Sequence, residues 1–124
     1  MTDVAAVVDL TSRGSELLAQ AKASASRRAA GTMTNQGGMK TVLLALLAGG
    51  ELAEHDAPPA ATLMCLTGTA DFFVGAQITR LEAGQILAIP PVRHSVTAVT
   101  DCTVLLTIAR GPAPAPVEVA LGTA

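Results

Sequence analysis

Two histidines, His55 and His94, are the side chains in this sequence best suited to hold a metal or a small ligand, and the chain has no others. Imidazole binds metals readily and changes its charge near neutral pH. Two imidazoles alone make a weak site for most divalent metals. Three interpretations stay open: a structural pair bonded to each other, to water or to a backbone carbonyl; a metal-free grip on a small anionic or polar ligand; or a metal site.

A few other side chains could take part in such a site. A metal would need Cys65, Asp56, Glu54 or water as additional ligands. Cys65 has no cationic neighbour in the sequence that would favour its thiolate, so it is more typical of a small buried hydrophobe than of a nucleophile. Arg93 could bind a ligand carboxylate, although a surface arginine is the ordinary alternative. The candidate ligand-binding residues are His55, His94, Cys65 and Arg93, and the candidate metal ligands are His55 and His94.

Short segments rich in β-branched and aliphatic residues follow one another from Lys40 onward, separated by glycine and proline. Short strands at close spacing with turn signals predict an all-β sandwich or barrel. The expected strands are residues 41–48, 61–67, 71–74, 77–81, 85–89, 95–99 and 103–109. Because side chains alternate along a strand, residues 61, 63 and 65 should share one face, as should 94, 96 and 98. Phe72 and Phe73 are consecutive, so one should point inward and the other outward.

The two ends of the chain differ from this central part. Residues 3–23 predict a helix with an apolar stripe that Gly14 weakens, and a second short helix could begin at Ser12. Residues 23–38 are rich in Ala, Ser, Gly and Asn and predict an extended or irregular arm. We therefore divide the chain into an N-terminal helix and arm (1–38), a barrel (39–110) and a proline-rich tail (111–124) with a strand candidate at 117–121.

Composition excludes several classes of function. The chain has 124 residues, enough for one domain, and a formal net charge of −2 with no basic run longer than Arg27-Arg28, which argues against nucleic-acid binding. Its longest apolar run, residues 42–48, is too short to span a bilayer, and no signal peptide is evident. Two cysteines in such a domain are more typical of reduced thiols than of a disulfide. These features predict a cytoplasmic, soluble protein.

Two spaced patterns resemble the motifs of the cupin superfamily. The matching residues are Gly49, His55 and Gly68 in the first motif, and Gly84, Pro90 and His94 in the second. The segments LAEHDAPPAATLMCLTG and AGQILAIPPVRHSVTAVTDCTVLLTIAR are similar to the cores of small single-domain bacterial cupins of the RmlC-like superfamily. The family's second His, its Glu and its Asn would fall on Ala57, Ala61 and Ala98, so the metal-binding motifs are degenerate.

The resemblance implies a cupin double-stranded β-helix, or jelly-roll, barrel with a short N-terminal helical arm, assembled as a homodimer. We expect a protein that binds a small molecule in the barrel without conventional metal catalysis and without a cofactor. One alternative is a metal-dependent cupin enzyme, of dioxygenase or isomerase type, in which His55 and His94 hold a divalent metal. A third class is a structural dimeric module that works through its partners.

Overall fold

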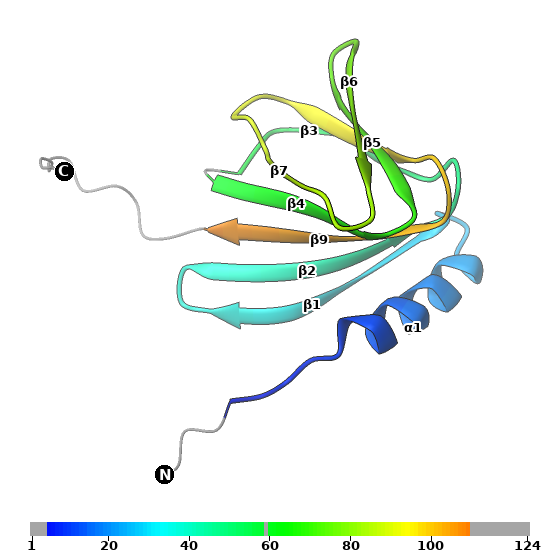
Figure 1. The fold of residues 1–124 in the computed structure, drawn as a ribbon, viewed down its shortest axis with the longest axis vertical. Helices are drawn as coiled ribbons and strands as arrows, with labels where there is room; N and C mark the ends of the chain where they lie inside the picture. The colour runs from blue at the N-terminus through cyan, green and yellow to red at the C-terminus, as the bar shows by residue number, and fades with distance from the viewer. Residues whose placement is uncertain (1–4, 59, 110–124) are drawn as a thin grey trace, which may run out of the picture.

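The computed structural model describes residues 5–58 and 60–109, which form one helix and nine strands (Figure 1). The helix is α1 (Leu10–Lys22). The strands are β1 (Arg28–Gln36), β2 (Met39–Leu46), β3 (Glu51–His55), β4 (Ala60–Thr67), β5 (Thr69–Val74), β6 (Gln77–Glu82), β7 (Ile86–Ala88), β8 (His94–Ala98) and β9 (Cys102–Ala109). The all-β expectation is confirmed.

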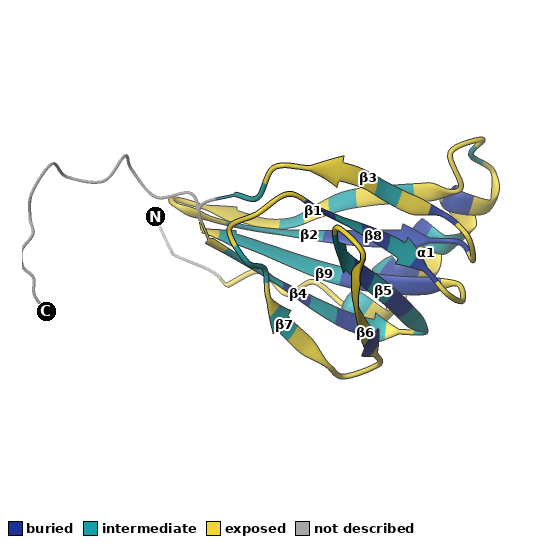
Figure 2. Ribbon diagram, turned by 90° about the horizontal axis from the view of Figure 1, so that it is seen from above, coloured by how far each residue is buried: buried dark blue, intermediate teal, exposed yellow. Residues whose placement is uncertain are grey.

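The strands form two antiparallel sheets that share one core. One sheet has the order β1-β2-β9-β4-β7 and the other the order β3-β8-β5-β6. Every second residue of the central strands points between the sheets, as the positions of Leu63 and Cys65 on β4 and of Val96 and Ala98 on β8 show. Figure 2 shows how the buried positions follow the central strands, while β3, β6 and β7 are mostly exposed. The alternation predicted for β4 and β8 is therefore confirmed.

Helix α1 covers the outer face of the five-stranded sheet over β1 and β2 (Figure 1). Its Leu17 and Ala21 pack against Leu43, Ala45 and Leu47 in a second apolar cluster. The predicted helix over 3–23 begins too early: residues 5–9 are not helical. The reason is Asp9, whose Oδ1 accepts hydrogen bonds from the backbone N–H groups of the helix's first turn and so caps the helix there. No second helix begins at residue 12.

Gly14, at which the sequence predicted a weak point of the helix, faces Thr103 of β9. A Cβ placed on Gly14 would stand 3.3 Å from the Cγ2 atom of Thr103, tighter than most contacts of that kind. The missing side chain therefore lets the helix approach the sheet. In the described part of the chain, no helix is both long and apolar enough to cross a membrane.

The segment predicted as an arm contains β1, which pairs with β2 from Arg28↔Leu46 to Gln36↔Met39. The boundary expected between residues 38 and 39 thus falls inside the β1–β2 hairpin. β3 is a second strand that the sequence did not predict. The tail at 111–124, including its strand candidate, lies outside the described residues.

Candidate functional site

The two histidines meet at one end of the barrel. His55 is the last residue of β3 and His94 the first of β8, and the two are paired in register. Their ring centroids are 4.3 Å apart, with the ring planes at 67°, so the edge of one ring faces the other. His94 is only 2% exposed, whereas His55 is exposed. His55 therefore lies on the solvent side of the pair.

Each imidazole is held by a backbone carbonyl of its own chain segment. The Nδ1 atom of His55 lies 2.9 Å from the carbonyl oxygen of Ala53, and that of His94 lies 3.0 Å from the carbonyl oxygen of Val92. Because a carbonyl only accepts hydrogen bonds, Nδ1 carries the hydrogen and donates it in both rings. In the neutral ring this leaves Nε2 as an acceptor. The chain's own backbone therefore orients each of the two rings.

A third ring extends the pair into the barrel. Phe72 of β5 stacks on His94, with centroids 5.1 Å apart and planes 24° from parallel. Phe72 is the inward-pointing member of the Phe72-Phe73 pair and is only 3% exposed. His55, His94 and Phe72 thus form a continuous series of ring contacts from the surface to the core.

A groove opens on the far side of Phe72, between β6 and β7. These strands are the edges of the two sheets, and no other strand of the described part of the chain pairs with either of them at this point. The groove, which we call the mouth groove, has a volume of about 220 Å³. Its lining residues are Phe72, Val74, Gln77, Thr79, Leu87, Ala88 and Pro90. Two further crevices, of about 250 and 300 Å³, flank α1 on the outer side of the five-stranded sheet.

Solved structures with this architecture match most of the chain. A conserved protein of unknown function from Streptococcus pyogenes is 22% identical, with a TM-score of 0.67, over 90% of this chain and 93% of that one. An RmlC-like cupin protein from Desulfovibrio desulfuricans is 28% identical, with a TM-score of 0.62, over 68% of this chain and 84% of that one. A cupin superfamily protein from Desulfitobacterium hafniense is 14% identical, with a TM-score of 0.62, over 66% of this chain and 76% of that one.

The chain is a small cupin barrel. The match to the Streptococcus pyogenes protein covers 90% of this chain, so it must include part of the segment before residue 39. The likeness therefore extends beyond the barrel predicted at 39–110. The sequence matches no protein-family model and no curated protein. The Streptococcus pyogenes protein is itself of unknown function, so these likenesses establish the fold and no specificity.

The donor atoms of this cupin do not fit a complete metal centre. Among residues 5–58 and 60–109, no three His, Cys, Asp or Glu side chains gather in a way that could hold a metal ion. The positions where the family would add ligands carry Ala57, Ala61 and Ala98, which have no donor atom. The two imidazoles alone are a poor site for most divalent ions.

The nearest carboxylates are occupied by Arg93. Its Nη1 lies 2.9 Å from Oδ1 of Asp56, its Nε lies 3.6 Å from Oε1 of Glu54, and its Nη2 donates to the backbone carbonyl of Glu54 at 3.3 Å. Glu54 and Asp56 are the sequence neighbours of His55, and Arg93 is the residue before His94. These contacts therefore connect the end of β3 to the start of β8 beside the histidine pair. In this arrangement the single positive charge of Arg93 is shared between two surface carboxylates, and the arginine binds its own chain.

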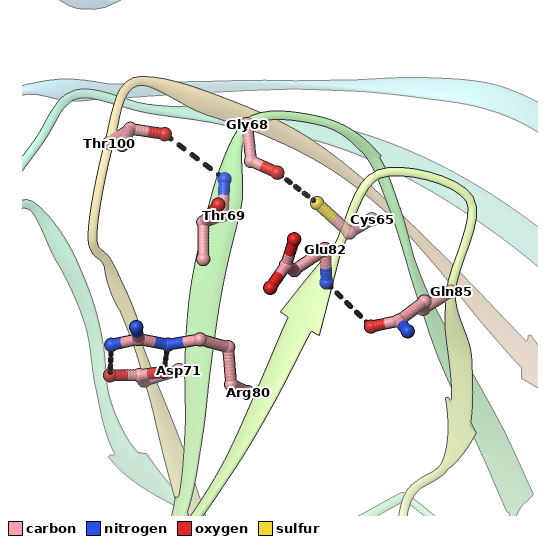
Figure 3. Close-up of polar contacts among 8 residues, drawn as sticks. All are labelled: Cys65, Gly68, Thr69, Asp71, Arg80, Glu82, Gln85 and Thr100. Carbon is pink, nitrogen blue, oxygen red and sulfur yellow. Dashed lines mark hydrogen bonds and ion pairs between the residues drawn. The ribbon is translucent and has the colours of Figure 1, made fainter.

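Cys65 lies in the core, toward the end of β4 that leads into β5, and its side chain is 0% exposed. Its thiol donates to the carbonyl oxygens of Thr67 and Gly68 at 3.4 and 3.3 Å, the second of which appears in Figure 3. Burial, together with the nearby Glu82 carboxylate, raises the pKa of this thiol. Burial also raises the pKa of Cys102 to about 12, and both thiols are free. Cys65 is thus a buried, protonated side chain.

The structure brings together only part of the predicted site. His55 and His94 are in contact, Arg93 flanks them, and Cys65 lies apart from them in the core. None of these four residues lines any of the three cavities described above. The groove residues on β6 and β7 were not singled out from the sequence, which predicted only that one of Phe72 and Phe73 points inward.

Proposed function

We propose that this cupin binds a small molecule in the mouth groove, without conventional metal catalysis. The observation that carries the proposal is the position of Phe72, which lines the groove and stacks on His94. Ligand sites are typically concave and mostly apolar, with a few polar groups that fix orientation. The mouth groove has this character, because Phe72, Val74, Leu87 and Pro90 supply apolar surface and Gln77 and Thr79 supply polar groups.

The groove suits a small occupant. Its volume of about 220 Å³ is below the range of roughly 300–1,000 Å³ that is typical for drug-sized ligands. It exceeds the cavity of roughly 150 Å³ that suffices for benzene in an engineered protein core. A ligand of one ring, or a short aliphatic chain of similar size, is therefore the expected occupant.

The proposal is tested by titrating the ¹⁵N-labelled chain with a mixed library of small fragments and following the backbone amide resonances. Fragments that bind should shift amides on β5, β6 and β7 around Phe72, Thr79 and Leu87. Thr79→Trp places a large side chain at the exposed groove wall and should abolish these shifts. Ile78→Trp adds the same side chain to the opposite face of β6 and should leave them unchanged, because Ile78 points outward beside Phe73.

Two results would overturn the proposal. One is that no fragment shifts the groove amides. The other is that the shifts survive Thr79→Trp as well as they survive Ile78→Trp. In either case the mouth groove is not the binding site of this cupin.

A metal-dependent enzyme, of dioxygenase or isomerase type, is the second candidate, and one observation favours it. Both Nδ1 atoms donate to carbonyls, which is the arrangement that frees Nε2 and orients metal-binding histidines. Metal analysis of the purified protein separates the two functions. Stoichiometric metal in the wild type that is lost in both His55→Ala and His94→Ala would replace the metal-free proposal with this one.

We also propose that two copies pair through the part of the five-stranded sheet that α1 leaves uncovered. Met64 and Ile86 are cross-strand neighbours there, and Ile86 is 55% exposed, while Leu105 on the other side of Met64 already packs against the apolar cluster under α1. Ile86→Glu should convert a dimer into a monomer in sedimentation equilibrium, whereas Ile78→Glu on the other sheet should not. A wild-type monomer at high concentration contradicts this pairing and, with it, the purely structural dimeric module.

The two free thiols support the proposal that the protein resides in the reducing cytoplasm.

A further inference from the structure

This inference rests on the proposed function and concerns the chemical class of the ligand, which the uncharged lining of the mouth groove restricts. We infer that the groove binds an uncharged single-ring molecule that carries one amide or hydroxyl group. Three features support this: the absence of charge in the lining, the free polar groups on β6, and the size of the groove.

Among residues 5–58 and 60–109, no ionisable side chain lines the mouth groove, and the register of β5 and β6 explains why. Thr79 faces Phe72 and Gln77 faces Val74, so both uncharged polar residues of β6 share the inward face with groove residues. Arg80 follows Thr79 in β6, so its side chain lies on the opposite, outward face, where it pairs with Asp71 of β5.

The guanidinium of Arg80 is bound by the carboxylate of Asp71. Its Nε and Nη2 atoms donate to the two carboxylate oxygens of Asp71 at 2.9 and 3.1 Å (Figure 3). The charged pair of these two strands is therefore held on the outer surface, away from the groove. A charged ligand would lose hydration in an apolar groove without meeting an opposite charge, whereas an uncharged ligand avoids most of that penalty.

The polar side chains in the lining are available to a ligand. Within the described residues, neither the Gln77 amide nor the Thr79 hydroxyl makes a side-chain hydrogen bond in the protein. A carboxamide offers both donors and an acceptor, and a hydroxyl offers one donor and acceptor sites. Together they match a ligand group that also donates and accepts, such as an amide or hydroxyl. The remaining lining is aliphatic or aromatic, which suits the body of a ring.

Three benzene derivatives of nearly equal size test this class: benzamide, benzoate and benzylammonium. Each is titrated into the full ¹⁵N-labelled chain at neutral pH, and Kd is taken from the groove amides. Benzamide should bind roughly tenfold or more tightly than either ion, because only the ions carry an uncompensated charge into the groove. Thr79→Val should weaken benzamide by about fivefold, the usual effect of one lost hydrogen bond.

A charge introduced into the lining separates specific binding in the groove from nonspecific adsorption to the protein surface, because only binding in the groove should change its ligand preference. Gln77→Glu should make benzylammonium the preferred probe, because a carboxylate then faces the groove. Ile78→Glu adds the same charge to the opposite face of the same strand and should keep benzamide preferred. If Gln77→Glu and Ile78→Glu change the preference equally, the inference is wrong.

The outcomes separate this inference from the function on which it rests. If the wild-type groove binds benzoate or benzylammonium as tightly as benzamide, the ligand class is wrong and the binding function stands. If none of the probes, and no fragment, shifts the groove amides, the proposed function fails. If the groove amides shift with protein concentration alone, a second copy occupies the groove, and the small-molecule inference is overturned.

Discussion

Gly68, the closing glycine of the first cupin motif, offers a sharp test of how this barrel is packed. Its φ is +76°, a backbone conformation that residues with a side chain rarely adopt. A Cβ at this position would stand 2.2 Å from the carbonyl oxygen of Asp101 and 2.8 Å from the Cβ of Cys102. Since backbone atoms cannot move aside as a flexible side chain can, Gly68→Ala must shift the turn between β4 and β5 or the start of β9.

Two costs add in Gly68→Ala. The left-handed backbone conformation costs about 1–2 kcal/mol for a residue with a side chain. Forcing an extra carbon into a filled site costs about 1–3 kcal/mol more. The expected loss in the free energy of unfolding is therefore roughly 2–5 kcal/mol, a large part of the total stability of a domain of this size.

Gly75→Ala is the matched control, because Gly75 has a φ of +57° but a Cβ added to it would meet no atom within 4 Å. It should lose only the conformational part, about 1–2 kcal/mol. Urea unfolding followed by circular dichroism measures both variants, and the gap should appear as a midpoint lower by roughly 1 M in Gly68→Ala. Equal losses of unfolding free energy in the two variants would refute the packing argument, since only the cost of the backbone conformation would then remain.

Three further outcomes follow from contacts described above. Because burial raises the pKa of both cysteine thiols, a thiol reagent at about pH 8 should label the native protein far more slowly than the protein in urea, and equal rates would place the thiols at the surface. The hydrogen bonds from Arg80 lower the Asp71 pKa, so this pair stabilises the fold above the ordinary Asp pKa and loses its effect as the pH falls. The stability advantage of wild type over Asp71→Asn should therefore shrink between neutral pH and about pH 2–3 in urea titrations, and a constant difference would contradict the assignment. Gly14→Ala should be nearly neutral in the wild type but stabilising by about 1 kcal/mol in a Thr103→Ser background, which removes the Cγ2 atom that the new Cβ would meet. A double-mutant cycle in thermal unfolding measures this coupling, and simple additivity would argue against the close helix–sheet contact.

The histidine pair shows how far the sequence could be used to predict the site. The motif spacing indicated that His55 and His94 belong together, and the alternation along β8 placed His94 inside the barrel. Both are properties of strand periodicity and of the recognised motifs, so they can be extracted from the chain alone. The contact between the two rings, and the stacking of Phe72 on His94, required the register between strands far apart in sequence.

The strands that the sequence missed, β1 and β3, are edge strands. β1 carries small residues in place of an apolar alternation, and β3 is mostly exposed and polar. Such segments pair because a neighbouring strand offers its hydrogen-bonding groups, and their own residues carry little of the signal. The start of α1 was misplaced for a related reason, since the Asp9 cap outweighs the apolar residues that precede it.

The mouth groove could not be predicted from spacing, because it depends on which strands remain unpaired. Its lining residues come from β5, β6, β7 and Pro90, and of these only Pro90 belongs to a motif that the sequence analysis recognised. The sequence also could not show that Arg93 would be engaged by Glu54 and Asp56. That pairing depends on the turn after β3 coming close to the start of β8.

The anchoring of both imidazoles by backbone carbonyls has a consequence for rebuilding the site. In a site where the metal itself holds the rings, loss of a ligand would release the others and disturb the surrounding strands. Here each ring is held by a nearby backbone carbonyl, that of Ala53 on β3 for His55 and that of Val92 just before β8 for His94. The placement of the two rings thus does not depend on donor atoms at positions 57, 61 and 98, which carry alanine. The same independence makes the barrel a scaffold on which ligands can be added back one at a time and their separate effects on metal affinity measured.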